Sequence, residues 1–288
     1  MRIALLAPIR NSLYARTLAY RIEKQPGLKL VSVIYRKALT WDRIQAEFRR
    51  DRGRLLRKVY KKLVLGDTRF EGSSRDTIGG LAAELGVPPV NLRALCRAIN
   101  VPCIPVYAFD DDRVCDFLEQ AAPDVIAFTG GGIIRSPILE LAPQGVLNCH
   151  MGLLPEYRGM DVVEWPYLQE PEITPTGITV HRMDQGIDTG PVLLVHRMPS
   201  RSGESFTGLR ERMEREMVEV MVQVLCGLRD GALITKASQS LQGRQYFVLH
   251  SRLYAEAASR LAAGRIGVQT RPTAGLMGDS TDFDDRHT

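Results

Sequence analysis

Asn148 and His150 stand two residues apart at the end of a short apolar run, 145–150, which leads into a loop marked by Gly and Pro over 152–159. The run predicts a buried strand. Because alternate residues of a strand point to the same face, the two side chains are expected to project side by side, with Cys149 on the opposite face. An amide donor next to an imidazole can stabilise an oxyanion and move a proton.

A carboxylate that could act with this pair lies in the turn DQGIDTG, residues 184–190. The turn follows Thr176–Met183, an apolar run that predicts another strand. Asp188 in the turn could orient an imidazole and stabilise its protonated form. From composition alone, the commoner explanation is a polar pair at a strand end and a turn Asp that bonds to the backbone.

The first third of the chain predicts the frame that positions these residues. Ile3–Ala7 and Leu28–Tyr35 are apolar enough for buried strands, and Ser12 is a suitable N-cap for a helix that runs to about Lys24. Strand, helix and strand at this spacing predict a parallel βαβ unit. Further strands are predicted at 102–107, 125–128 and 191–198, and a covering amphipathic helix at 203–227. The fold class is therefore α/β, a Rossmann-like, mostly parallel twisted sheet with helices on both faces.

Three segments depart from the regular pattern, so the predicted domain organisation is a catalytic unit at 1–229 with additions. Residues 38–100 form an insertion with basic helical character, including eight Lys and Arg between positions 49 and 62. Such a charge run is usually a solvated face; the alternative is a cationic wall for substrate phosphates. Residues 230–269 form a small C-terminal segment with a short strand at 245–249 and a helix at 252–263. The composition of 270–288 predicts disorder.

Composition excludes several classes of protein. Apolar residues make up 44% and charged residues 25%, ordinary values for a globular chain. The net charge of +5 suits an anionic small molecule and does not by itself indicate nucleic acid. Five scattered cysteines without a C-x-x-C pair predict neither disulfides nor a metal site. Reduced thiols and the absence of a run long enough to cross a membrane predict a cytoplasmic protein without a membrane partner.

The order of the two motifs adds information that composition lacks. N-x-H-x-x-L-L-P from Asn148 to Pro155, followed by D-x-G-x-D-T-G from Asp184 to Gly190, resembles the folate-dependent formyltransferase family. The resemblance covers roughly residues 1–230. Family members commonly have Ser before Leu-Leu-Pro, where this chain has Gly152. The Asn, His and Asp of the family pattern are all present.

The resemblance implies a formyl transfer from the co-substrate 10-formyltetrahydrofolate to a primary amine, without a metal. Asn148 and a protonated His150 would hold the oxyanion, Asp188 would orient His150 and relay a proton, and loss of one oxyanion donor typically costs about 3–4 kcal/mol of barrier. The pterin pocket falls, by resemblance, on the strand-end loop with three glycines and on the start of the Asp-rich turn: Thr129, Gly130, Gly131, Gly132, Ile133, Asp184, Gln185 and Gly186.

The acceptor is less well specified than the donor. Residues expected to contact it are Arg158, His181, Asn11 and Ser12. The chain lacks the Gly-Ser-Asn phosphate loop of phosphoribosylglycinamide formyltransferases and has far less than the C-terminal domain of methionyl-tRNA formyltransferases. It is therefore closest to enzymes that act on nucleotide-linked amino sugars. The alternatives are an amino acid, peptide or carrier-bound amine, a formyltetrahydrofolate hydrolase and a catalytically silent folate-binding protein. A homodimer is also compatible with the sequence.

Overall fold

The computed structural model describes residues 1–37, 74–130, 132–169, 176–232 and 243–263. Within these residues a seven-stranded sheet has the order β3-β2-β1-β4-β5-β7-β8, and a two-stranded sheet pairs β6 with β9. The strands of the large sheet are β1 (Arg2–Ala7), β2 (Lys29–Arg36), β3 (Cys103–Val106), β4 (Val125–Phe128), β5 (Val146–His150), β7 (Thr176–Arg182) and β8 (Val192–Met198). The predicted strands are thus present, with ends that shift by at most one residue.

The large sheet is parallel from β3 to β5 and antiparallel from β5 to β8. In the parallel part, Leu6 pairs with Phe128 and Phe128 with Asn148, so β1, β4 and β5 end at the same level. In an open α/β sheet, ligands bind outside the carboxyl ends of the strands. The edge beyond Asn148 is therefore where a site is expected.

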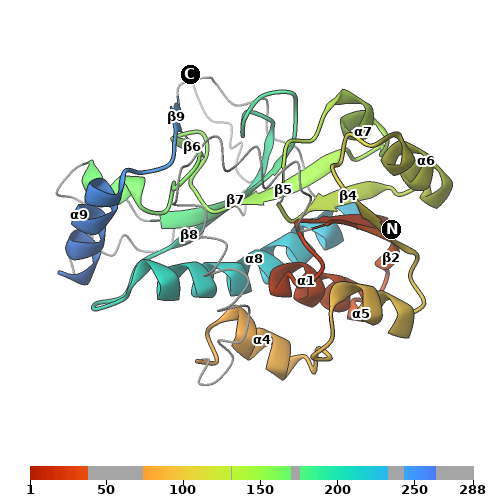
Figure 1. The fold of residues 1–288 in the computed structure, drawn as a ribbon, viewed down its shortest axis with the longest axis horizontal. Helices are drawn as coiled ribbons and strands as arrows, with labels where there is room; N and C mark the ends of the chain where they lie inside the picture. Colours follow the sequence, from red (N-terminus) through yellow and green to blue (C-terminus); the bar gives the residue numbers. More distant parts are fainter. Residues whose placement is uncertain (38–73, 131, 170–175, 233–242, 264–288) are drawn as a thin grey trace, which may run out of the picture.

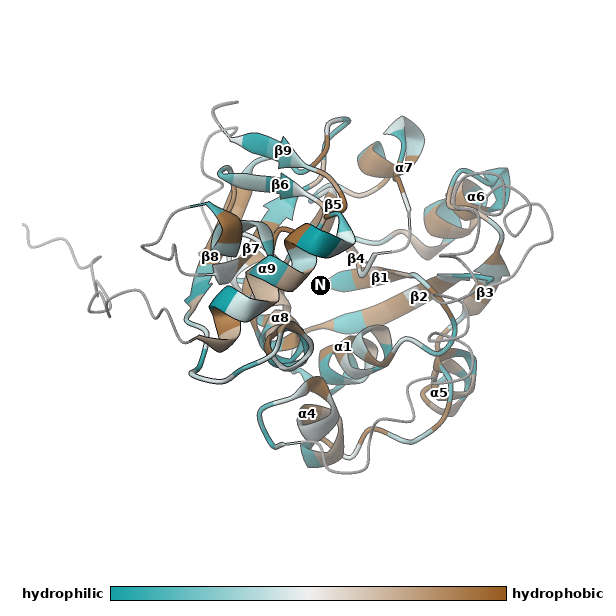
Figure 2. Cartoon of the chain, turned by 60° about the vertical axis from the view of Figure 1, so that its left-hand side comes forward, coloured by the Kyte–Doolittle hydropathy of each residue, from teal (hydrophilic) through white to brown (hydrophobic). Residues whose placement is uncertain are grey.

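Helices cover both faces of the sheet, which confirms the predicted fold class (Figure 1). They are α1 (Leu13–Lys24), α4 (Ile78–Glu84), α5 (Leu92–Ala98), α6 (Asp112–Ala121), α7 (Ser136–Glu140), α8 (Phe206–Arg229) and α9 (Ser251–Ala262). The larger core cluster joins α1, α4, α5 and α8 to one face, and a smaller one joins α6 and α7 to the other. Figure 2 shows the matching pattern, with hydrophobic strands between helices of mixed hydropathy.

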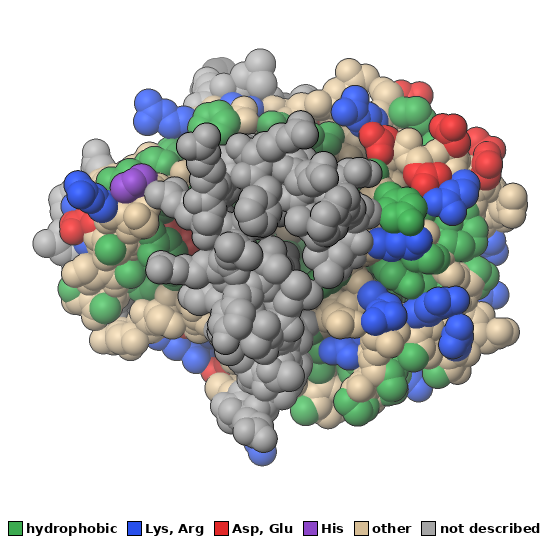
Figure 3. Space-filling view, in the orientation of Figure 1, with side chains coloured by type: hydrophobic (Ala, Val, Ile, Leu, Met, Phe, Trp, Pro, Cys, Tyr) green, Lys and Arg blue, Asp and Glu red, His purple; other side chains and the backbone are tan. Residues whose placement is uncertain are grey.

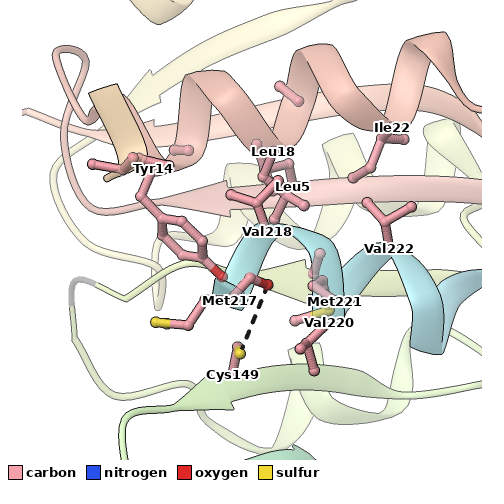
Figure 4. Close-up of a cluster of buried hydrophobic side chains, with 14 of the residues drawn as sticks. Leu5, Tyr14, Leu18, Ile22, Cys149, Met217, Val218, Val220, Met221 and Val222 are labelled. Atoms are coloured by element: carbon pink, nitrogen blue, oxygen red, sulfur yellow. Dashed lines mark hydrogen bonds between the residues drawn. The ribbon is translucent and has the colours of Figure 1, made fainter. Parts of the chain in front are cut away.

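Residue types explain where the elements begin and how they pack. Ser12 caps α1, its Oγ accepting a hydrogen bond from the backbone N–H of Ala15, as an N-cap serine should. Met213, Met217 and Met221 of α8 are buried against the sheet, where they fill the core. Figure 4 shows Met217 and Met221 of α8 between Cys149 on one side and Tyr14 and Leu18 of α1 on the other.

The C-terminal segment packs on its own chain. Strand β9 (Arg244–Tyr246) lies parallel to β6 (Tyr157–Gly159), and α9 packs on the 3₁₀ helix Trp165–Leu168. Ala257 and Leu261 of α9 belong to the larger core. The predicted strand and helix of this segment are therefore confirmed, and their partners lie in the loop that follows β5.

That loop also contains a 3₁₀ helix of four residues, Trp165–Leu168, with Pro at its second position. Trp165 is only partly buried: its ring tilts against that of Tyr246 with centroids 5.1 Å apart, and its Nε1 donates to the backbone oxygen of Phe247. Strand β6 was not predicted, because three residues carry no pattern of their own.

The basic run at 49–62 and the tail 270–288 lie outside the described residues. Among the described helices, none combines the length and apolar character needed to cross a membrane. On the face seen in Figure 3, acidic side chains gather where Figure 1 places α6, and basic ones lie below them.

Candidate active site

Strand β5 carries the predicted amide–imidazole pair to one face of the sheet. Val146 belongs to the core under α6 and α7, so Asn148 and His150, two and four residues later, point to that same face. Cys149 points the other way, with its Sγ 3.9 Å from the backbone oxygen of Met217 in α8 (Figure 4). The alternation read from the sequence is therefore correct.

His181 enters the site because β7 runs antiparallel to β5 and pairs residue for residue with it. Asn148 lies directly opposite His181, and directly opposite residues share a face. The Nδ2 of Asn148 is 3.1 Å from Nε2 of His181. The Nδ1 of the same ring lies 3.2 Å from the backbone oxygen of Arg182, which can only accept, so Nδ1 donates and Nε2 can accept from Asn148.

Asp188 completes the cluster from the turn between β7 and β8. Its backbone is left-handed, with φ of 53°, a conformation that Asp tolerates better than most residues. Its Oδ2 lies 3.6 Å from Nδ1 of His150 and accepts a 2.9 Å hydrogen bond from the backbone N–H of Gly159. Its Oδ1 lies 3.5 Å from both Nδ2 of Asn148 and Nε2 of His181. The three residues predicted to be catalytic, together with His181, thus meet at one carboxylate.

The two nitrogens of His150 have different surroundings. Nε2 lies 2.8 Å from the backbone oxygen of Tyr157, a group that only accepts, so Nε2 carries the proton of the neutral ring. Burial lowers the pKa of His150 and outweighs the opposing effects of Asp188 and the Tyr157 carbonyl. The imidazole is therefore neutral at pH 7, with the unprotonated Nδ1 facing Asp188.

Asp188 is ionised over the whole physiological range. Burial by itself would raise the pKa of this carboxyl group, but contact with the His181 ring, attraction to the His150 ring once that ring is protonated, and the Gly159 N–H together lower it to about 2. A carboxylate held ionised beside a neutral imidazole stabilises the imidazolium once the ring takes up a proton. The pair is therefore suited to accept a proton from a reacting group.

These two pKa shifts predict how stability depends on pH. The unfolded chain protonates His150 near its ordinary pKa of 6.5, while the folded chain resists protonation, so stability is full above 6.5 and declines as pH falls below it. Asp188 adds a second loss as pH falls from 3.8 to about 2. Urea denaturation at pH 7.5 and 5.5 should show that the free energy of unfolding falls less between the two pH values for His150→Gln than for the unchanged protein. Equal losses in the two proteins would contradict the assignment.

Gly152 leaves room for the imidazole. A Cβ at this position would lie 2.8 Å from Nε2 of His150 and 3.0 Å from the Tyr157 carbonyl oxygen. Both atoms belong to the hydrogen bond that fixes the tautomer of His150. Formyltransferases commonly have Ser at this position, so this chain differs from them directly beside the His150 imidazole.

The two segments expected to line a pterin pocket lie against each other. The side chain of Gln185 donates a 2.9 Å hydrogen bond to Ser136, which begins α7 just after the glycine loop. Asp184 shapes the turn by accepting from the backbone N–H of Gly186 and from Thr189. On the facing loop, Thr129 donates to the backbone oxygen of Leu6.

The glycine loop itself is open on one side. Among the described residues, a Cβ at Gly130 would meet no atom within 4 Å, whereas one at Gly132 would lie 2.9 Å from the Arg36 guanidinium. The side chain of Ile133 is 76% exposed. Gly131 lies outside the described residues. The open backbone at Gly130 is the part that suits close approach by a flat ligand.

The residues predicted to bind the acceptor separate into two groups. His181 is in the cluster but 1% exposed, so it supports Asn148 and Asp188 from behind. Arg158 donates to the backbone oxygen of Gly243 and so anchors the C-terminal segment. Asn11 and Ser12 follow β1, which β4 separates from β5, a lateral distance of about 10 Å. The hydroxyl of Ser12 is engaged as the cap of α1.

The backbone groups of the site, the Tyr157 carbonyl and the Gly159 N–H, were not among the predicted site residues. Backbone groups have no residue signature, although a Gly at position 159 was a hint of unusual geometry. Within the described part of the chain, no cluster of three or more His, Cys, Asp and Glu could hold a metal ion.

Comparison with known proteins gives a consistent result. Residues 105–225, which include the whole cluster, match the Formyl transferase family. The methionyl-tRNA formyltransferase of Trichlorobacter lovleyi is 36% identical over 169 residues, 57% of this chain and 51% of that protein. The chain spans about half the length of the curated relatives it matches.

Solved structures share the fold at low sequence identity. The phosphoribosylglycinamide formyltransferase from Bacillus halodurans superposes with a TM-score of 0.53 at 14% identity, covering 79% of this chain and 95% of that one. A sugar N-formyltransferase from Shewanella sp. gives 0.52 at 13% identity, covering 91% and 87%.

Proposed function

Residues 105–225 match the Formyl transferase family, and from that premise we propose that this chain is a folate-dependent formyltransferase that transfers a formyl group from 10-formyltetrahydrofolate to a primary amine. The observation that carries the proposal is the convergence of Asn148 and His150 on Asp188, at 3.5 and 3.6 Å. The open backbone at Gly130 leaves room for a pterin, and the hydrogen bond between Gln185 and Ser136 holds the two segments beside it together.

His150 acts as the proton acceptor through Nδ1. A neutral amine attacks the formyl carbon, a C–N bond forms, and negative charge develops on the formyl oxygen. Nδ1 removes the proton that the attacking nitrogen must lose, and Asp188 stabilises the imidazolium. The same proton then goes to the nitrogen of the folate as its bond to the formyl carbon breaks, which returns His150 to its neutral state.

Asn148 holds the developing oxyanion. In the resting site its Nδ2 donates to Asp188 over a long 3.5 Å contact. A substrate oxygen replaces this contact more readily than the shorter one to His181, because less hydrogen-bond energy is lost. Once His150 is protonated, the imidazolium adds positive charge beside the oxyanion.

For the acceptor we propose the amino group of a nucleotide-linked amino sugar. The positive charge of the chain and its structural likeness to a sugar N-formyltransferase support this class. The sequence relatives support a second candidate, an aminoacyl or other carrier-bound amine, because they are methionyl-tRNA formyltransferases.

Incubation with 10-formyltetrahydrofolate, with and without candidate amines, tests the proposal. Release of tetrahydrofolate that requires an amine, together with mass-spectrometric detection of the formylated product, is the expected result. Release without amine would instead indicate a hydrolase, and binding without release a silent folate-binding protein. A panel of nucleotide-linked amino sugars and aminoacylated carriers then ranks the acceptors by kcat/KM.

A further inference from the structure

Strand β6 links the active site to the C-terminal segment. Its sheet partner in the described residues is β9, with Tyr157 opposite Arg244 and Gly159 opposite Tyr246. Two more hydrogen bonds extend the pairing, from the Met160 N–H to the Tyr246 carbonyl at 3.0 Å and from the Arg244 N–H to the Glu156 carbonyl at 3.3 Å. A pair of strands this short is not stable by itself, so side-chain packing must hold it.

The two edges of β6 serve different partners. Backbone groups of residues two apart in a strand point to the same side. The backbone carbonyl of Glu156 and the N–H of Met160 point to β9, whereas the carbonyl of Tyr157 and the N–H of Gly159 point to the site. The Tyr157 carbonyl accepts from Nε2 of His150 at 2.8 Å, and the Gly159 N–H donates to Asp188 at 2.9 Å. Both members of the acid–imidazole pair are therefore positioned by a strand that β9 holds in place.

The side chain of Tyr246 fixes β9 against β6. It is 7% exposed and stacks on the ring of Tyr157 with centroids 5.4 Å apart and an angle of 25°. Gln169 bridges the two rings, because its Nε2 donates to the Tyr246 hydroxyl and its Oε1 accepts from the Tyr157 hydroxyl. The ring of Trp165 covers the outer side of Tyr246.

We propose that Tyr246 is a positioning residue of the active site, acting through β6 on His150 and Asp188. The C-terminal segment 243–262 is therefore part of the catalytic unit. The effect on turnover rests on the proposed function, but the effect on His150 does not, because the protonation of His150 can be followed without substrate.

The test compares Tyr246→Ala with the conservative Tyr246→Phe, which keeps the ring stack and loses only the bond from Gln169. NMR titration of the His150 ring, assigned with His150→Gln, is the main measurement. In Tyr246→Ala, β6 is released and water reaches the imidazole, so the titration midpoint of His150 should rise towards about 6.5. Tyr246→Phe should titrate like the unchanged protein. A control in the same segment, Leu253→Ala on the exposed side of α9, should also leave the midpoint unchanged.

Turnover gives a second measurement. Displacement of catalytic groups by about 1 Å can cost about 100-fold in rate, so kcat of Tyr246→Ala should fall by that order while Tyr246→Phe retains most of it. A merely structural role would lower kcat only through the fraction unfolded and would leave the pH profile of the folded enzyme in place. If Tyr246→Ala does not fold, Tyr246→Leu can replace it, because Leu keeps apolar bulk but removes the ring stack. The titration midpoint of His150 should then rise in Tyr246→Leu.

An unchanged His150 midpoint in a folded Tyr246→Ala or Tyr246→Leu would overturn the proposal. A failure of the proposed function looks different. In that case the unchanged protein releases no tetrahydrofolate with any amine, yet the midpoint of His150 still moves in Tyr246→Ala.

Discussion

Replacing Asp188 with Asn is expected to leave a folded protein whose turnover number is lower by about 10⁴-fold, the loss measured when the acid of an acid–His pair becomes an amide. The amide oxygen can still accept from the Gly159 N–H, so the turn keeps its shape. The charge that stabilises protonated His150 is gone, and burial already disfavours that form. His150 therefore becomes a much weaker proton acceptor.

The measurement is kcat for formyl transfer, with circular dichroism and thermal unfolding to verify the fold. Asp230→Asn is the matched control, because Asp230 lies at the end of α8 and pairs with Arg229 on the surface. It should retain activity close to that of the unchanged protein. A folded Asp188→Asn with more than a tenth of normal turnover would show that the carboxylate is not the partner of His150.

Replacing Gly159 with Ala is expected to reduce both stability and turnover. The residue has φ of 100°, and a Cβ there would lie 2.3 Å from the Tyr246 carbonyl oxygen. Backbone strain of this kind costs about 1–3 kcal/mol. To relieve the contact, β9 must move from β6 or the Gly159 N–H must turn away from Asp188, and a shift of this size lowers kcat by about 100-fold.

The Gly203→Ala variant separates the effect of backbone strain from the effect of the close contact with the Tyr246 carbonyl. Gly203 has φ of 72°, and no atom of the residues that the structure describes lies within 4 Å of its Cβ position, so the control carries the backbone cost without the clash. Urea denaturation and kcat should show a modest loss of stability and normal turnover for Gly203→Ala, against a large loss of both for Gly159→Ala. Equal behaviour of the two variants would mean that the approach of Tyr246 to Gly159 is unimportant.

The parts of the site that depend on one strand could be predicted from the sequence. The period of two in β5 placed Asn148 and His150 on one face and Cys149 on the other, and Ser12 marked the start of α1 correctly. Each of these inferences needs only local geometry. Asp188 was assigned to the same site through the resemblance of the two motifs to the formyltransferase family.

The parts that depend on pairing between distant segments could not be predicted. His181 lies opposite Asn148 because β7 is antiparallel to β5, and no residue type encodes that direction. Strand β6 exists through its pairing with β9, some 87 residues away between Tyr157 and Arg244. Strand β6 contributes backbone groups to the site, so the types of its side chains do not reveal this role.

The antiparallel register of β5 and β7 makes the site inseparable from the native sheet. A slip of one residue would turn every side chain of β7 to the other face, so that Val180 or Arg182 replaced His181 beside Asn148. Compact folding intermediates that contain both strands in the wrong alignment would hence have no assembled cluster. The pKa of His150 would then reach its lowered, native value only when the two strands align, so following this pKa during refolding would time that step.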